Sequence, residues 1–292
     1  MSISFACNLF GYSRQVYYRS KKRVSKNRDR AELVVGLVKS VRMIMPRIGG
    51  KKLYHILQQR LQDLGVGRDK LFTILRANKL LIKPKRQYHI TTNSHHRFRK
   101  HKNLIEDMMV NRPEQVWVSD ITYIGDREHP QYLALVTDSY SKKIVGYDVS
   151  NSLHAQGTVR ALDMAIAKRQ YPKKALIHHS DRGLQYCSDL YQQVLRKNGI
   201  KCSMTEQYDP YQNATAERVN GILKQEFLLG LKVKDLDLMN ELMRQSIMIY
   251  NTQRPHLSCH MYTPEKMHQQ SEITIKTYKR KRVENPKSLL VK

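Results

Sequence analysis

Three acidic residues in this chain have the chemistry and the spacing of a metal-dependent catalytic site. Asp120, Asp181 and Glu217 are separated by 60 and 35 intervening residues, and each lies in its own short polar motif within an otherwise apolar stretch. Carboxylate oxygens suit hard divalent ions such as Mg²⁺ or Mn²⁺. Two such ions, about 3.5–4 Å apart, stabilise both the attacking and the leaving oxygen of an in-line phosphoryl displacement. The three acids therefore predict a two-metal enzyme that acts on a polynucleotide backbone.

The positive charge of the chain is concentrated at its two ends. The net charge is +27; residues 1–105 hold 25 Lys and Arg against 4 Asp and Glu, whereas residues 106–275 hold 20 of each kind and residues 276–292 hold 7 against 1. No acid occurs from Lys70 to Ile105, which favours a polyanion-binding segment over an ordinary solvated basic face. We expect the polyanion to be nucleic acid rather than a membrane surface, because neither end has the apolar face of an interfacial helix.

Composition argues against several other classes of protein. With 292 residues and 40% hydrophobic content, the chain is long enough to bury a core in one large or two medium domains. We expect a cytoplasmic protein, because no apolar run approaches the length of a membrane span and no signal peptide is recognisable. The four cysteines stand apart from one another, which favours reduced thiols over disulfides or a zinc site.

The N-terminal residues 1–82 are predicted to form a basic helical region that binds DNA. An apolar stretch at residues 3–10 is followed by Gly11 and by a short helix capped by Ser13, an order that resembles the back half of a helix-turn-helix. Arg14 on that helix is a candidate contact to a DNA groove or phosphate, and a plain packing role for the helix is equally compatible with the pattern. A basic linker is expected at residues 19–30, and three short helices are expected between residues 31 and 75.

Residues 83–113 are predicted to form a second basic linker. The segment from Lys83 to Lys102 has little apolar periodicity, and its cations, among them Lys83, Lys85 and Arg86, are expected to follow a phosphate backbone. Residues 276–292 are expected to form a basic C-terminal tail. Between these two segments, residues 114–275 form the predicted catalytic domain.

From Glu114 onward the pattern changes to that of strands. Runs at residues 117–124, 132–137 and 144–149 predict three consecutive strands of an antiparallel meander. Helices are expected at residues 154–169, 188–198, 214–229 and 236–250, with short strands at residues 175–178 and 200–204. This order of elements resembles the ribonuclease H-like fold, an α/β fold with a mixed sheet.

Each of the three acids is expected on a different kind of element. Asp120 lies on a mostly apolar strand face, where a buried carboxylate is costly unless a metal or a cation compensates it. Asp181 lies where a strand ends in a glycine-containing loop, a common place for catalytic groups. Glu217 begins a helix after Asn213, and Lys224 follows on the same helix face, where it is placed to bind a DNA phosphate. Taken singly, Asp120 is also compatible with an acid that caps a neighbouring strand, and Glu217 with a solvated Glu–Lys pattern.

Other residues compete for these roles. Asp138 ends the second strand and is our substitute if Asp120 has no part in the site. His178 and His179 precede Asp181, but imidazole prefers softer ions, so ordinary loop histidines are the favoured interpretation.

Together these motifs resemble the second-reading-frame (OrfB) products of insertion sequence 3 family transposases, which are relatives of retroviral integrases. The matching segments are Trp117-x-x-Asp120-Ile121-Thr122-Tyr123, His179-Ser180-Asp181-Arg182-Gly183 with Gln185-Tyr186 and Ser188, Asn213-Ala214-x-x-Glu217, Lys224, and Tyr250-Asn251 through Arg254-Pro255-His256 to Thr263-Pro264. The resemblance covers nearly the whole chain. It implies a DNA transposase that cleaves and joins strands at insertion-sequence ends, with Asp120, Asp181 and Glu217 as ligands of two Mg²⁺ ions and Lys224 as a DNA contact.

The resemblance also implies partners. These are DNA at the element's ends and in the target duplex, a first-reading-frame product or a frameshifted fusion with it, and further copies of the chain assembled on DNA. The sequence departs from the family pattern at Gln212, where Asp is usual, and at residues 47–52, where an aromatic residue usually precedes the glycine. His95, His96 and His101 lack paired cysteines, so we expect no zinc domain of the integrase kind.

Two rival functions remain open from the sequence. One is a ribonuclease H-like nuclease that only hydrolyses its substrate, which the joining of DNA ends would distinguish from a transposase. The other is a catalytically inactive DNA-binding regulator of transposition, which metal-dependent activity would exclude.

Overall fold

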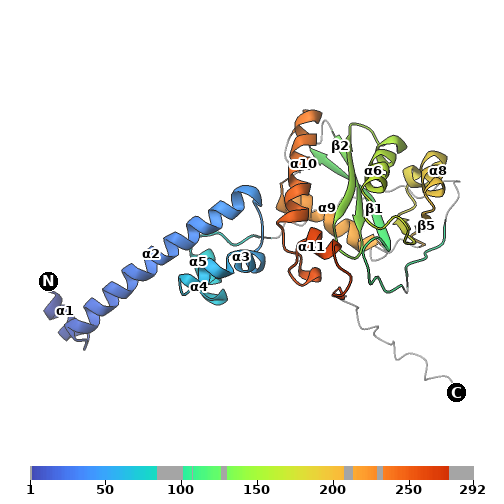
Figure 1. Ribbon diagram of the computed structural model, residues 1–292. Coiled ribbons are helices and arrows are strands. Elements are labelled where there is room, and N and C mark those ends of the chain that lie inside the picture. The colour runs from blue at the N-terminus through green and yellow to red at the C-terminus, as the bar shows by residue number, and fades with distance from the viewer. Residues whose placement is uncertain are drawn as a thin grey trace, which may run out of the picture.

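A five-stranded mixed sheet organises the second half of the chain (Figure 1). The strand order is β3-β2-β1-β4-β5, with bounds Val116–Gly125 (β1), Pro130–Asp138 (β2), Ile144–Ser150 (β3), Ile177–Ser180 (β4) and Lys201–Met204 (β5). The first three strands pair antiparallel, and β4 pairs parallel with both β1 and β5. The predicted meander, the mixed sheet and the ribonuclease H-like fold are confirmed. This computed structural model describes residues 2–83, 101–106, 108–125, 130–206, 213–228 and 233–275.

Helices cover both faces of the sheet (Figure 1). One face packs against α6 (Ala155–Ala167), α7 (Leu184–Cys187) and α8 (Asp189–Lys197), and the other against α9 (Ala214–Glu226) and α10 (Leu236–Thr252). Successive residues of β3 serve the two cores, since Ile144 belongs to the α9–α10 side and Val145 to the α6–α8 side. Helix α6 lies so close to β3 that a Cβ on Gly146 would be 2.0 Å from the carbonyl oxygen of Ala161. Only glycine therefore permits this approach.

The N-terminal region is helical, as predicted, but its helices differ from the expected ones. They are α1 (Ile3–Leu9), α2 (Arg14–Ile44), α3 (Gly50–Ile56), α4 (Gln58–Asp63) and α5 (Arg68–Ala77). The side chain of Ser13 caps α2 by accepting a hydrogen bond from the Val16 amide at 3.3 Å, as expected. The linker predicted at residues 19–30 is wrong, because α2 runs through it without a break. Lys and Arg are good helix formers, and no glycine or proline interrupts residues 14–35.

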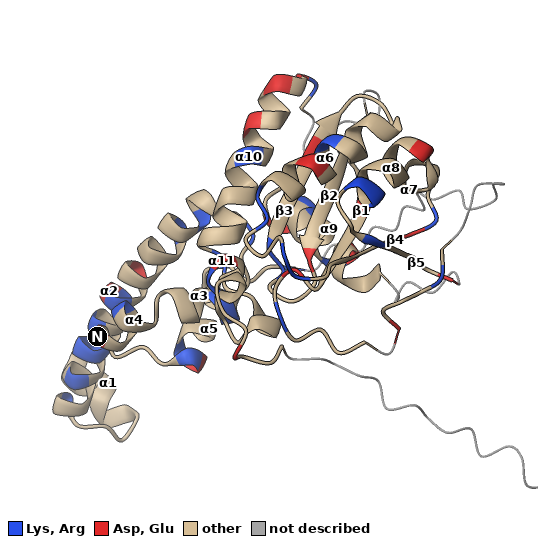
Figure 2. Cartoon of the chain, turned by 45° about the vertical axis from the view of Figure 1, so that its right-hand side comes forward, with Lys and Arg blue, Asp and Glu red and all other residues tan. Residues whose placement is uncertain are grey.

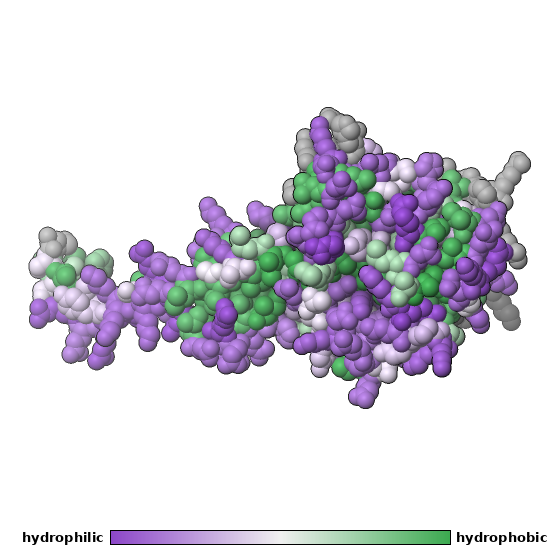
Figure 3. Space-filling model, turned by 45° about the horizontal axis from the view of Figure 1, so that its top comes forward, coloured by the Kyte–Doolittle hydropathy of each residue, from purple (hydrophilic) through white to green (hydrophobic). Residues whose placement is uncertain are grey.

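Helix α2 extends away from the rest of the chain and carries much of the N-terminal charge. Lys and Arg recur along it in Figure 2, and in Figure 3 the middle of this arm is mostly hydrophilic. Only its C-terminal part contributes fully buried residues, Val34 and Val38, which pack in the same core cluster as α3 and α5. The N-terminal part of α2 is therefore a solvated, basic helix.

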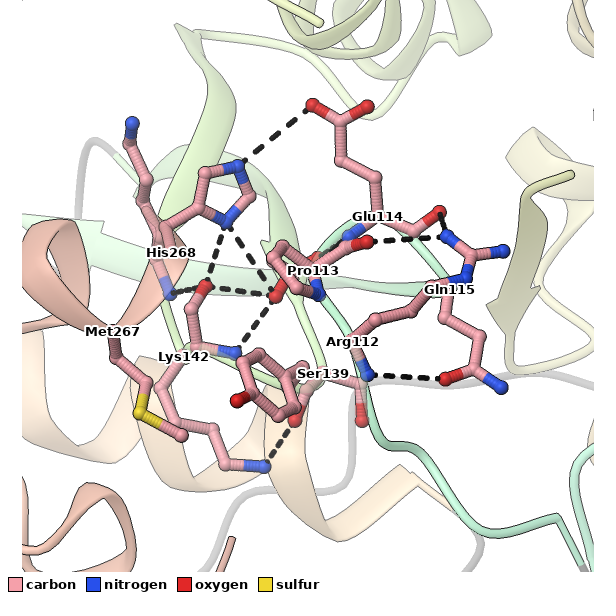
Figure 4. Close-up of polar contacts among 12 residues, drawn as sticks. Arg112, Pro113, Glu114, Gln115, Ser139, Lys142, Met267 and His268 are labelled. Atoms are coloured by element: carbon pink, nitrogen blue, oxygen red, sulfur yellow. Dashed lines mark hydrogen bonds and ion pairs between the residues drawn. The ribbon is translucent and has the colours of Figure 1, made fainter. Parts of the chain in front are cut away.

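A buried charge cluster fastens the short helix α11 (Pro264–His268) to the sheet (Figure 4). The imidazole of His268 lies 3.7 Å from a carboxylate oxygen of Glu114 and 3.7 Å from one of Asp138, and all three residues are almost completely buried. Glu114 also accepts hydrogen bonds from the amides of Gln170 and Tyr171 at 2.7 and 3.0 Å. The contacts of His268 join segments more than a hundred residues apart in the sequence.

Several of the expected features lie outside the described residues. These are Lys85, Arg86, His95, His96, Gln212, most of the linker at 83–113 and the tail at 276–292. Among the helices that the structure describes, none has the length and apolarity needed to span a membrane.

Candidate active site

Asp120 lies in the middle of β1, half-buried, and two donors hold its carboxylate. Its Oδ1 accepts a hydrogen bond from the Ile121 amide at 2.9 Å, and its Oδ2 accepts one from Nδ2 of Asn220 on α9 at 2.8 Å. Burial and the nearby charge of Asp181 raise the pKa of Asp120 to about 7; Glu217 adds to this rise, and the hydrogen bond from Asn220 opposes it. The other two acids are therefore close enough to Asp120 to act on its charge.

Asp181 follows the last residue of β4, as the sequence predicted. Its Oδ1 accepts a hydrogen bond from the amide of Gly183 at 3.0 Å, which fixes the carboxylate against the turn. A Cβ on Gly183 would also be 3.0 Å from this Oδ1 and 3.3 Å from Oε1 of Gln185. A side chain at position 183 would therefore crowd the carboxylate, which explains the glycine.

Glu217 lies in the first turn of α9, where the residue is exposed to solvent, and partial burial of its carboxyl group raises the pKa of that group. The core-facing residues of α9 include Ala216, Val219 and Leu223, as the helical spacing predicted, and also Ile222; Phe227, predicted on the same stripe, is buried directly after the helix ends. Asn213 takes the N-cap position, but its side chain does not cap the helix. Instead, its Nδ2 donates to the carbonyl oxygen of Ser119 on β1 at 3.0 Å and so ties the start of α9 to the strand of Asp120.

The charges of Asp181 and Glu217 act on Asp120, but the three carboxylates do not form a preformed metal site. Among the residues that the structure describes, no three His, Cys, Asp or Glu side chains converge closely enough to hold an ion. The donor set nevertheless fits a hard divalent cation, because it consists of carboxylate oxygens and because the charges of Asp181 and Glu217 raise the pKa of Asp120. A bound cation would relieve this repulsion.

Lys224 lies on the same face of α9 as Glu217 and Asn220, as predicted, and points toward β1. Its Nζ donates to Oγ1 of Thr122 at 2.8 Å, two residues along the strand from Asp120. Burial lowers the pKa of this ammonium group, and the charge of Asp120 opposes that shift. The ammonium group therefore lies beside the acids, and its contact to DNA stays a prediction.

Two expectations about neighbouring residues are wrong. His178 and His179 are not loop histidines: both are fully buried in β4, where Nε2 of His178 lies 2.7 Å from Oγ of Ser119 and 2.8 Å from the hydroxyl of Tyr191. Asp138 does not reach the acids, since it pairs with Trp117 and so lies on the opposite face of the sheet from Asp120.

The sequence interpretation missed two further residues of the site. Asn220 was expected on the face of Glu217, but its hydrogen bond to Asp120 was not foreseen, because the two residues lie a hundred positions apart. Tyr186 is buried, and its hydroxyl has no hydrogen-bond partner within the described part of the chain. Burial, Tyr191 and the charges of Asp120 and Asp181 all raise its pKa, and a Cβ on Gly183, beside Asp181, would be 3.6 Å from its ring. In the sequence, only the position of Tyr186 within the Asp181 motif indicated that it belongs near the site.

Of the remaining predicted DNA contacts, the structure describes Arg14 and Lys83, which lie apart from each other. Arg14 is exposed at the start of α2, and Lys83 is exposed at the end of the helical region, where it lines the same cleft as Glu217.

Comparison with known proteins agrees with this geometry. Two family models, both described as the integrase core domain, match residues 110–210 and 198–264. An insertion element IS600 31 kDa protein of Shigella sonnei is 35% identical over 273 residues, which are 90% of this chain and 98% of that protein. The InsF transposase for insertion sequence IS3A of Escherichia coli (strain K12) is 33% identical to this chain over 197 residues, 65% of this chain and 67% of that protein. This chain belongs to the insertion sequence 3 family of transposases.

Solved structures with a similar fold are more distant. The catalytic core domain of HTLV-2 integrase, solved in complex with magnesium, aligns with a TM-score of 0.43 and 19% identity over 54% of the transposase and 97% of that chain. A chain of a simian T-cell lymphotropic virus intasome, solved in complex with PP2A regulatory subunit B56 gamma, aligns with a TM-score of 0.48 and 18% identity over 79% and 78% of the two chains.

Proposed function

We propose that this transposase cleaves DNA and joins DNA strands at a single metal-dependent site formed by Asp120, Asp181 and Glu217. The observation that carries the proposal is the hydrogen bond from Asn220 to Asp120 at 2.8 Å, which holds the helix that bears Glu217 against the strand that bears Asp120; the charges of Asp181 and Glu217 also raise the pKa of Asp120. These three carboxylates provide oxygen ligands for divalent ions, Mg²⁺ or Mn²⁺, and two ions are expected.

The side chains around the acids then have separate tasks. When bound, the ions supply Lewis-acid stabilisation of the attacking and leaving oxygens of the phosphodiester. Asn220 orients the Asp120 carboxylate, and the Gly183 amide orients that of Asp181. Lys224, held beside β1 by Thr122, places a positive charge next to the acids, where it attracts a DNA phosphate. The acids act as ligands, so none of them is required as a general base.

Different parts of the chain have different roles in this proposed function. Residues 1–82 bind DNA, residues 83–113 connect them to the catalytic core at 114–275, and residues 276–292 add a basic tail. Arg14, Lys83, Lys85 and Arg86 contact phosphates in this scheme. A first-reading-frame product, or a fusion with it, recognises the element's ends, and several copies of the chain assemble on the DNA.

Asp181→Asn tests the catalytic assignment. This change removes a charged ligand but keeps the size of the side chain, so cleavage and joining of a labelled element-end duplex in Mg²⁺ should be lost while DNA binding is retained. Asp189→Asn is the matched control, because Asp189 is exposed in the first turn of α8. Full activity of Asp181→Asn would overturn the assignment. Cleavage without joining would favour the purely hydrolytic nuclease, and wild-type inactivity both with Mg²⁺ and with chelator would favour the inactive regulator.

A further inference from the structure

A cleft of about 550 Å³ separates the helical region from helix α9. One wall comes from the junction of α2 and α3 and from the end of the helical region, and the other comes from α9; the lining residues used below are Arg47, Lys83, Glu217, Arg218 and Gly221. The two walls are joined at one end, where the amide of Arg47 donates to the carbonyl oxygen of Glu226 at 3.0 Å. Glu217, one of the three acids, lies on the wall at the other end of the helix.

The cleft carries positive charge that the chain itself does not neutralise. Glu226 is already occupied, because it accepts two hydrogen bonds from Arg254 at 2.8 Å each and one from Lys52 at 3.0 Å. Arg218 and Lys83 are both exposed. Among the described residues, neither they nor Arg47 forms an ion pair with a carboxylate.

The same positive charge contributes to a lowered pKa of a buried histidine. The pKa of His256 falls to about 2, first because of burial and then because of the surrounding cations, Arg254, Lys142, Lys52 and Arg218. Of these, Lys52 and Arg218 line the cleft itself. The cleft therefore attracts an anion.

The shape of the cleft suits an extended chain of anions. Glu217 and Glu226 are nine residues apart on α9, which corresponds to about 14 Å along the helix axis. A nucleic-acid strand carries one phosphate per roughly 3.4 Å of helix axis, so the distance corresponds to about four phosphates. Gly221 stands midway along this wall, and a Cβ built there meets no atom within 4 Å, so the centre of the wall is open.

We propose that this cleft binds the sugar–phosphate backbone of the DNA strand on which the acids act, with Arg47, Lys83 and Arg218 as its phosphate contacts. The inference rests on the proposed function for the identity of the polyanion. The helical region and α9 both contact the same strand, so the bound strand extends directly to Glu217. The DNA-binding surface thus includes the boundary between the two parts of the chain.

Fluorescence anisotropy with a labelled DNA duplex in chelator measures binding without cleavage. The double change Arg47→Gln and Arg218→Gln should weaken binding roughly tenfold or more at low salt, and the slope of log affinity against log salt should become shallower by about 2, close to 0.9 for each phosphate that the variant no longer neutralises. Arg196→Gln is the matched control, because Arg196 is exposed in the last turn of α8, on the far face of the sheet.

Gly221→Leu tests the cleft without changing its charge. Leucine favours the helix more than glycine does, so the protein should fold, while the side chain obstructs the middle of the wall and weakens binding to a similar degree. Arg218→Lys, which retains the charge, should bind more tightly than Arg218→Gln. Thermal unfolding of each variant confirms that its fold is intact.

Different results would contradict the DNA-binding cleft and the catalytic assignment. If the double variant and Gly221→Leu bind DNA within about twofold of Arg196→Gln, with an unchanged salt slope, the cleft is not the binding site, whatever the activity. If the cleft variants lose binding but the wild-type protein neither cleaves nor joins DNA in Mg²⁺, the cleft stands and the catalytic proposal fails.

Discussion

Nδ2 of Asn220 on α9 donates a hydrogen bond to Oδ2 of Asp120 on β1 at 2.8 Å. This contact links the helix that carries the third acid to the strand that carries the first. Asn220→Ala should therefore leave Asp120 free to turn away, and we expect the single-turnover cleavage rate in Mg²⁺ to fall roughly 10- to 100-fold, as is usual when a residue that orients a metal ligand is removed. Asn198→Ala, an exposed asparagine at the end of α8, is the control. An unchanged cleavage rate and metal requirement in Asn220→Ala would show that Asn220 does not position Asp120.

The repulsion among the acids should reduce the stability of the metal-free protein. Asp120→Asn removes one charge from this group and keeps the hydrogen bond to Asn220 available through its side-chain oxygen. We expect its melting temperature in chelator at neutral pH to rise by a few degrees, because about 1 kcal/mol corresponds to about 2–4 °C in a domain of this size. Calorimetry checks this, and Asp189→Asn should show no such rise. A lower melting temperature for Asp120→Asn would mean that its carboxylate stabilises the fold rather than straining it.

The buried cluster around His268 should make stability depend on pH. Burial disfavours the imidazolium, but Asp138 and Glu114 outweigh this effect and raise the pKa of His268 to about 8. The folded protein therefore binds this proton more tightly than the unfolded chain, so the stabilisation, about 2 kcal/mol, is complete below pH 6.5 and is lost as the pH rises through about 8. Urea unfolding from pH 6 to 9 measures it.

His268→Asn should abolish this pH dependence and destabilise the protein at pH 6, because two buried carboxylates lose a cationic partner. His55→Asn, an exposed histidine of α3, provides the comparison. The assignment fails if His268→Asn keeps the wild-type dependence between pH 6 and 9.

Glu226 should hold the helical region and the catalytic core together. It pairs with Arg254, whose side chain is only 1% exposed, and with Lys52 of α3. Glu226→Gln leaves the buried guanidinium without a counter-charge, so we expect a loss of about 3–5 kcal/mol in the free energy of unfolding. Limited proteolysis should also cut the chain faster between the two parts.

Glu241→Gln is the matched comparison for this change. Glu241 pairs with Arg244 on the exposed surface of α10, where water screens the interaction. Its loss should leave both stability and proteolysis unchanged. Equal effects of the two substitutions would mean that Glu226 has no special role at the junction.

The sequence by itself predicted most of the elements and singled out the three acids that are proposed as metal ligands. The strands of the meander follow from short β-rich and apolar runs, and the stripe of α9 follows from a spacing of about three and a half residues; both are local properties of the chain. The same local reasoning failed at residues 19–30, where a run of charge was taken for a linker although lysine and arginine extend α2.

Only the tertiary structure decided which side chains meet. Asn220 contacts Asp120, Glu226 contacts Arg254 and Lys52, and Asp138 turns away from the acids toward His268. Asp120 and Asp138 are both acids on neighbouring strands, and their roles separate because the antiparallel register places them on opposite faces of the sheet. Contacts of this kind depend on how the elements pack, and packing joins residues whose separation in the sequence carries no periodic signal.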